Sequence, residues 1–496
     1  MLFNSPQFAV FFISILLIFP VMPRKFRSAY LLAISLIFYM SWNVKYVFLI
    51  CSSILITYVC GILIGNAKNN ISNRKKCIVA VGFVVNILIL ALFKYLNFFI
   101  ININKVLSFL FLPEVNVRFN VMLPVGISFY TFQALGYIID VYRGKIEYEK
   151  NIIKYALFIT FFPMLIAGPI ERSSNIFKQI DELSQRKAYK YEEIISGLIL
   201  MLWGYFLKMV VADRAAILVN NVYDSYWLHG FFGLSIATCL FAVQIYCDFA
   251  SYSTIAIGAS RILGFRIIEN FNAPYFSRSV GEFWRRWHIS LSTWFRDYLY
   301  IPLGGSRCSL ARTNFNIVIV MIVSGLWHGA GLSFIAWGAL WAVFMVISNV
   351  TKKIRSSVIE KLKVNKYCLS FKFGQVLLTI FLTCFAWIFF RAPSLTIALK
   401  IVKRIVVERD FWSIFNGQIY DLGLSCLEFN ILFFGIALVF LVDIIRYKKN
   451  KTIDAFLLEQ NLWFQWVFVI VMLMFIFIYG IYGLGIDSQQ FIYFQF

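Results

Sequence analysis

The chain has 496 residues, of which 61% are hydrophobic and only 14% are charged. Soluble domains carry roughly 45–50% apolar and about 25% charged residues, so this composition excludes a soluble enzyme. The formal net charge of +22 does not indicate nucleic-acid binding, because Lys and Arg collect in short loops between apolar windows, as the positive-inside rule requires. A polytopic helical membrane protein is the class that fits, and residues 1–496 are interpreted as a single domain because no long polar break divides them.

About a dozen apolar windows are long enough, or nearly so, for a membrane-spanning helix of about 20 residues. They lie at 7–22, 28–42, 44–65, 77–99, 121–139, 153–170, 194–212, 230–247, 314–347, 375–390, 428–445 and 462–484. Several are too short or too broken for simple spans; 121–139 contains Pro124 and Gly126, and 153–170 ends in Gly168-Pro169. Both of these windows are predicted to be re-entrant segments buried in protein, since irregular backbone at membrane depth must be shielded from lipid.

The basic loops predict the orientation of the chain. Arg24, Lys25 and Arg27 separate the first two windows, and a second basic loop at 68–76 follows the third, so both loops are predicted to be cytoplasmic. The 140–154 loop carries four further cations and is predicted to return to the cytoplasm. We therefore expect a multi-pass protein of the inner (cytoplasmic) membrane, in contact with membrane lipid.

The segment 261–312 differs in kind from the apolar windows. It holds eight arginines against three acidic residues, interleaved with Phe, Trp and Tyr. Such a segment is predicted to form amphipathic helices and loops that lie at the cytoplasmic interface or fold into a funnel. An ordinary positive-inside loop explains the arginines, taken alone, equally well. No internal repeat is evident, which disfavours transporter folds built from duplicated halves.

His328 is the most informative of the three histidines in the chain. It follows an apolar run that starts just after Arg312, so a helix from Asn314 would put it roughly 21 Å from the cytoplasmic edge of a core roughly 30 Å thick. An ionisable side chain at that depth indicates a functional site; a core histidine bonded to a nearby hydroxyl or carbonyl is the alternative. A neutral imidazole can take a proton from an alcohol as that alcohol attacks a thioester or ester, so acyl transfer is the reaction indicated.

Three other side chains leave alternatives open. Asp248, in another apolar window, either orients a partner in the catalytic cavity or only caps the helix that follows it. If its segment is helical, His288 shares a face with Ser292, which a structural hydrogen bond explains as readily as catalysis. Tyr493, near the end of the chain, is either a mobile nucleophile or an interfacial aromatic anchor, and the surrounding residues alone favour the anchor. The nine cysteines form no CxxC pair, and no metal site is expected.

Five segments carry motifs: Pro124–Gln133, Phe162–Arg172, Glu269–Tyr275, Glu282–Gly305 and Gly325–Gly329. Together they resemble the membrane-bound O-acyltransferase family, and within it the bacterial alginate and peptidoglycan O-acetylases, over essentially the full length of the chain. One departure matters. Where the family usually has Asp-Phe-Ser-Gly-Tyr-Ser-Asp, this chain has Asp248-Phe-Ala-Ser-Tyr-Ser-Thr254, so the role of the second acid cannot be carried over.

The resemblance implies that His328 is the membrane-embedded catalytic histidine and that His288 is the second polar signature position on the cytoplasmic side. It also implies a funnel that admits an acetyl thioester, either acetyl-CoA or a carrier-bound thioester, with no tightly bound cofactor. A partner acetyltransferase on the far side of the membrane is expected to complete transfer to the polysaccharide acceptor. The terminal segment 491–496 resembles the aromatic motif of this branch, in which the tyrosine, here Tyr493, is a candidate acyl relay.

We therefore predict an all-α, polytopic membrane O-acetyltransferase acting for a cell-surface polysaccharide, alginate-like or peptidoglycan. His328 is the predicted general base, and His288 orients donor or acceptor. Further residues are assigned to the substrate channel and the anionic donor entrance: Asp248, Trp327, Arg285 and Arg286. One rival is a polysaccharide flippase or transporter, which so many windows would suit. Another is a lipid-linked glycosyltransferase, for which the Glu408-Arg409-Asp410 segment is the only near match to an acidic metal pair.

Overall fold

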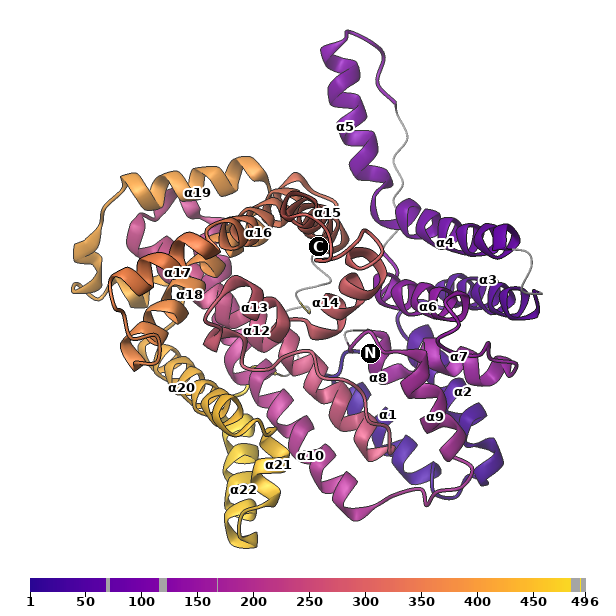
Figure 1. Cartoon of the computed structure of the whole chain (residues 1–496). Helices are drawn as coiled ribbons and strands as arrows, with labels where there is room; N and C mark the ends of the chain where they lie inside the picture. The colour runs from indigo at the N-terminus through magenta and orange to yellow at the C-terminus, as the bar shows by residue number, and fades with distance from the viewer. Residues whose placement is uncertain (68–71, 116–122, 167, 483–490, 492–496) are drawn as a thin grey trace. The chain divides into compact units, whose positions relative to one another are not determined.

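The structure is a computed structural model that describes residues 1–67, 72–115, 123–166, 168–482 and 491. Over these residues it is helical and contains no strand (Figure 1). Nine helical stretches in the described part of the chain are long and apolar enough to cross a membrane: Tyr46–Asn66, Asn73–Lys94, Tyr191–Asp224, Phe231–Ile262, Leu310–His328, Leu332–Val350, Leu369–Arg391, Cys426–Lys449 and Leu462–Tyr479. The predicted all-α, multi-pass membrane fold is confirmed.

The chain divides into two compact units, and the first comprises Met1–Gly197 with Ala256–Ile268. Its helices are α1 (Pro6–Ile18), α2 (Arg27–Met40), α3 (Tyr46–Asn66), α4 (Ser72–Lys94), α5 (Leu96–Phe109), α6 (Ile127–Tyr142), α7 (Ile152–Thr160), α8 (Phe162–Leu165), α9 (Ser173–Glu182), the start of α10 (Tyr191–Tyr205) and the end of α12 (Phe231–Ile262). The second unit comprises Leu198–Ile255 with Glu269–Phe496, so α10 and α12 each contribute to both.

The second unit contains every described residue of the predicted site. After α10 the chain continues through a π-helical segment, η2 (Phe206–Ala212), into α11 (Asp213–Asp224). The remaining helices are α13 (Val280–Arg286), α14 (Ile289–Phe295), α15 (Leu310–His328), α16 (Leu332–Val350), α17 (Lys352–Lys361), α18 (Leu369–Arg391), α19 (Leu395–Val407), α20 (Cys426–Lys449), α21 (Ile453–Leu458) and α22 (Leu462–Tyr479). Short one-turn or π segments lie at Tyr226–Leu228, Pro274–Phe276, Arg296–Tyr300, Phe411–Ile414 and Gln418–Leu422.

The apolar windows and the helices differ in two places. The 314–347 window is two helices, α15 and α16, because the chain leaves the helical conformation at Gly329 and re-enters it at Leu332. The 77–99 window ends early: α4 stops at Lys94, and a separate helix, α5, begins at Leu96. Within the arginine-rich stretch only short helices form, and α13 and α14 have seven residues each, too few to cross a membrane.

The two windows expected to be re-entrant form helices too short for a full span. α6 has 16 residues, nearly all of them buried, and it packs against α3 and α4 (Figure 1). α7 has nine residues and is followed at once by the single turn of α8. Residues 121–122 and 167 of these windows lie outside the described residues. Apart from the exposed first two residues of α7, Ile152 and Ile153, these helices are mostly buried in protein, as the sequence predicts, and their re-entrant course stays a prediction.

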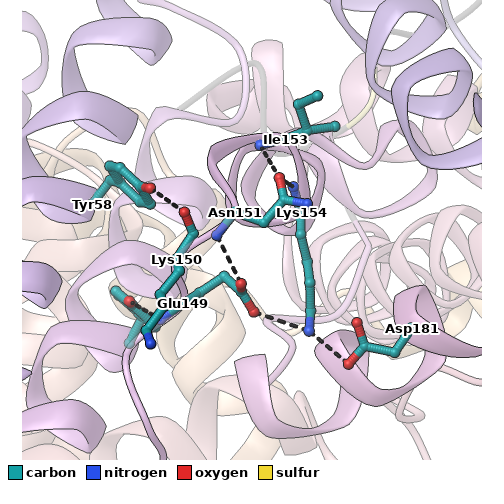
Figure 2. A network of polar contacts seen from close by, with 8 residues as sticks. Tyr58, Glu149, Lys150, Asn151, Ile153, Lys154 and Asp181 are labelled. Carbon is teal, nitrogen blue, oxygen red and sulfur yellow. Dashed lines mark hydrogen bonds and ion pairs between the residues drawn. The ribbon is translucent and has the colours of Figure 1, made fainter.

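The basic loop before α7 is held by a network of polar contacts (Figure 2). Asn151 caps the helix, since its side-chain oxygen accepts the N–H of Ile153 at 3.0 Å. The Lys154 ammonium lies 2.6 Å from an Asp181 oxygen and 2.9 Å from a Glu149 oxygen. These contacts tie the loop to α9 and the start of α7, so the charges predicted to mark the cytoplasmic face are also structural.

α15 and α16 form a hairpin whose two helices approach unusually closely (Figure 1). A Cβ atom added to Gly325 would lie 2.3 Å from the carbonyl oxygen of Phe334, and one added to Gly338 would lie 2.4 Å from that of Met321. Small residues at such a crossing let helix backbones pack directly, which is a main source of helix association in membranes. Because His328 follows Gly325 by less than one turn, this crossing fixes the position of the histidine.

Candidate active site

His288 and His328 lie next to each other in the fold although 40 residues separate them in the sequence. The centroids of their rings are 6.4 Å apart. His328 is the last residue of α15 and is 3% exposed, and His288 lies between α13 and α14 and is fully buried. The structure therefore brings together the two histidines that the sequence singled out.

Aromatic rings enclose this histidine pair. The ring of Trp327 lies 5.0 Å from that of His328 and 5.9 Å from that of His288, measured between centroids. Trp337 and Phe390 lie 5.0 and 5.4 Å from His328, and Phe249 meets His288 edge to face at 4.6 Å. Burial lowers the pKa of His288 to about 3, so its imidazole is neutral at physiological pH. A neutral imidazole among aromatic rings can accept a proton or a hydrogen bond from a hydroxyl.

The backbone at His288 is left-handed, with φ of +43°, and this turn separates α13 from α14. The condition for His288 and Ser292 to share a helix face is not met, because His288 precedes α14 as its N-cap and does not lie within a helix. The Ser292 hydroxyl instead donates to the carbonyl oxygen of Trp287 at 3.2 Å. A non-glycine residue in this conformation costs about 1–3 kcal/mol and persists only where its surroundings impose it.

Asn270 imposes that turn. Its carbonyl oxygen accepts the N–H of Ile289 at 2.9 Å, and its side-chain oxygen accepts the hydroxyl of Ser290 at 2.6 Å. Its side-chain amide donates to the Ser253 hydroxyl on α12 at 2.8 Å. Asn270 belongs to the motif Glu269–Tyr275, so that motif anchors the segment that carries His288 to α12.

Asp248 lies in the middle of α12, so the alternative that it caps a helix is wrong. Its carboxylate accepts a hydrogen bond from the Lys208 ammonium at 2.7 Å, and the same ammonium lies 2.8 Å from a carboxylate oxygen of Asp213. All three side chains are almost fully buried. Lys208 and Asp213 were not predicted from the sequence, although a lysine inside the apolar 194–212 window was a visible signal.

A profile of the membrane-bound O-acyltransferase family matches residues 37–390, which include both histidines. The chain belongs to this family. It is 35% identical over 412 residues to the probable alginate O-acetylase AlgI of Pseudomonas aeruginosa, covering 81% of this chain and 74% of that protein. A probable alginate O-acetylase AlgI of Pseudomonas putida is 32% identical across the full length of both chains.

Another relative is named for a different acceptor, peptidoglycan. The peptidoglycan O-acetyltransferase of Helicobacter pylori is 32% identical, over 82% of this chain and 80% of its own. Family membership and these relatives make the chain an acyltransferase and support O-acetylation of a polysaccharide at the membrane. The resemblance found from the sequence motifs is confirmed.

The two arginines predicted at the donor entrance differ in their surroundings. The Arg286 guanidinium donates to Glu282 and to the carbonyl oxygen of Asn272, each at 3.0 Å, and lies 4.8 Å from the centroid of the Tyr447 ring. Arg285 is exposed at the end of α13. Arg286 is thus held by contacts within the protein, whereas the side chain of Arg285 is exposed.

The C-terminal motif reaches the site at Phe491. This ring is fully buried, 4.3 Å from that of Tyr252 and 6.1 Å from that of Phe249, the ring that contacts His288. Tyr493, the candidate acyl relay, lies outside the described residues. The described part of the motif therefore packs against the aromatic wall of the histidine pair.

The acidic segment considered for a glycosyltransferase metal site has structural contacts. The Glu408 carboxylate accepts a hydrogen bond from Arg404, and that of Asp410 accepts the N–H of Phe232 at 2.8 Å. Within the described ranges, no group of three or more His, Cys, Asp or Glu side chains is arranged to hold a metal ion. The Asp410 carboxylate and the backbone carbonyl oxygen of Glu408, which accepts the N–H of Phe231 at 2.8 Å, hold the end of α19 against the start of α12.

Proposed function

We propose that this acyltransferase transfers acetyl groups from a cytoplasmic thioester, acetyl-CoA or a carrier-bound form, for O-acetylation of a polysaccharide outside the inner membrane. The observation that carries the proposal is the buried pair of His288 and His328, whose rings are 6.4 Å apart. The names of the relatives, alginate O-acetylases and a peptidoglycan O-acetyltransferase, support the acetyl group and the polymer class. The single domain 1–496 would act together with a partner acetyltransferase on the far side.

In this mechanism a neutral imidazole of His328 takes the proton of the acceptor hydroxyl as its oxygen attacks the thioester carbonyl. The new C–O ester bond forms as the C–S bond breaks, and the proton passes from the imidazolium to the departing thiolate. General base catalysis of this kind contributes typically about 10²–10⁴-fold in rate. His288, held neutral by burial, orients donor or acceptor by a hydrogen bond.

The other predicted residues take supporting roles. Trp327 lines the channel beside both histidines, and Arg285 attracts the anionic donor at the cytoplasmic entrance while Arg286 shapes it. Tyr493 is the residue that would accept the acetyl group before a partner protein on the far side takes it. Asp248 acts one step removed from the reacting atoms, through its neighbour Phe249.

The direct test compares base-labile acetate on cell-surface polysaccharides between a strain lacking this chain and the same strain complemented with it. We expect one polymer fraction to lose its acetate without the chain and to regain it on complementation, which also identifies the acceptor. A polymer that is retained inside the cell with unchanged acetate would contradict the proposal and support the flippase or transporter instead.

A further inference from the structure

The long helix α10–η2–α11 contains a π-helical segment that carries Lys208. In π-helical geometry the hydrogen bonds run from residue i to i+5, and such segments are frequent at functional sites. Here the end of α22 and Ile481, two residues after it, bind to the start of α11 and to this segment. The N–H of Ile481 donates to the carbonyl oxygen of Met209 at 2.9 Å, and the Arg214 guanidinium donates to the carbonyl oxygen of Tyr479 at 2.7 Å.

Lys208 is also the centre of a buried ionic cluster. Its ammonium is shared between Asp213, on the same long helix, and Asp248, on α12. Ionisable groups inside spanning helices are costly and usually functional, and removing one partner of a buried pair leaves an uncompensated charge. The bond to Asp248 ties the π-helical segment to the turn of α12 that carries Phe249 and Tyr252.

The same turn of α12 receives the C-terminal motif. The Lys208 ammonium lies 5.7 Å from the centroid of the Tyr252 ring, and Phe491 packs on Tyr252 and Phe249. Phe249 in turn contacts His288. Ile481 is therefore bound by η2, and Phe491 packs on α12. Lys208 joins these two elements through its bond to Asp248.

We propose that Lys208 is a positioning residue: through Asp248 it fixes a seat, formed by η2, Phe249 and Tyr252, that holds Ile481 and Phe491 of the C-terminal segment, the latter against the ring that contacts His288. Lys208 touches none of the reacting atoms in this role. The proposal deepens the proposed function and rests on it for the role of His288. It predicts that the bond to Asp248 controls how firmly the segment is held, whereas the bond to Asp213 does not.

The two aspartates supply a matched pair of variants. Asp248→Leu leaves Lys208 paired with Asp213, and Asp213→Leu leaves it paired with Asp248, so each protein keeps one balanced buried ion pair. Only Asp248→Leu cuts the link to α12. Hydrogen exchange of the peptide containing Ile481, measured by mass spectrometry on the full chain in nanodiscs, reports directly on its bond to Met209.

We expect exchange at Ile481 to be about tenfold faster in Asp248→Leu, the change that loss of about one hydrogen bond produces, and close to the original rate in Asp213→Leu. Lys208→Arg, which keeps the charge, should retain slow exchange. Equal rates in the two leucine variants would overturn the proposal. Should Asp248→Leu fail to fold, Phe491→Ala tests the seat from the other side, and unchanged exchange at Ile481 there would overturn it equally. Since no acyl donor is needed, this result stands or falls separately from the acetate test.

Discussion

Replacing His328 with Ala is expected to abolish polysaccharide O-acetylation while the protein remains folded in the membrane. If the imidazole is the general base, its removal costs about 10²–10⁴-fold in rate, which leaves no detectable acetate above background. The side chain is 3% exposed and contacts Trp327, Trp337 and Phe390, so Ala also removes packing. His328→Gln, which fills more of that volume, should therefore be equally inactive but closer to the original stability.

His229 provides the matched control for this experiment. It is the only histidine outside the pair, and its ring bonds to the Ser225 hydroxyl at 3.1 Å in the loop before α12. Acetate should be measured in His229→Ala and His328→Ala strains at equal amounts of membrane protein. Near-normal acetate in the first and none in the second supports the assignment. Acetate retained in His328→Ala, or lost equally in both, would contradict it.

Sequence alone can predict a functional residue when an ionisable side chain stands in an otherwise apolar stretch of the chain. His328 stands out because an imidazole follows an apolar run, and that conflict is visible without any tertiary information. Lys208 presents the same conflict inside the 194–212 window and could have been found in the same way. Of its two partners, Asp213 lies five residues later in the same long helix, whereas Asp248 meets Lys208 only through the packing of α12 against that helix and could not be predicted from sequence spacing.

The conformation around His288 was beyond the reach of sequence patterns. Histidine is enriched among the non-glycine residues with a left-handed backbone, but that conformation is uncommon for all of them, so the residue type did not predict the turn between α13 and α14. Asn270, which imposes the turn, lies 18 residues earlier. Only the family resemblance indicated that His288 and His328 are both signature residues of one site. The α15–α16 hairpin, in contrast, could have been predicted from the sequence. The 314–347 window is much longer than the about 20 residues of one span, and Gly329-Ala-Gly331 lies in its middle.

Gly325→Ala is expected to destabilise the protein and reduce its acetylation together. The added methyl would lie 2.3 Å from the carbonyl oxygen of Phe334, a backbone atom that cannot move without displacing α16. Overpacking of this kind costs about 1–3 kcal/mol, which is roughly a 5–150-fold change in the ratio of folded to unfolded protein. The displaced end of α15 carries His328, so the geometry of the histidine pair changes as well.

Gly374→Ala is the control, because it also lies in a spanning helix, α18, and its added methyl has no neighbour within 4 Å apart from the nearby backbone of its own helix. Thermal unfolding in detergent should show a lower midpoint for Gly325→Ala and an unchanged or higher one for Gly374→Ala, since Ala stabilises a helix relative to Gly by about 1 kcal/mol. Equal midpoints would mean that the close crossing at Gly325 does not hold the hairpin. A lower midpoint with full acetylation would separate the stability of the hairpin from the placement of His328, because the crossing would then stabilise the fold without setting the geometry of the histidine pair.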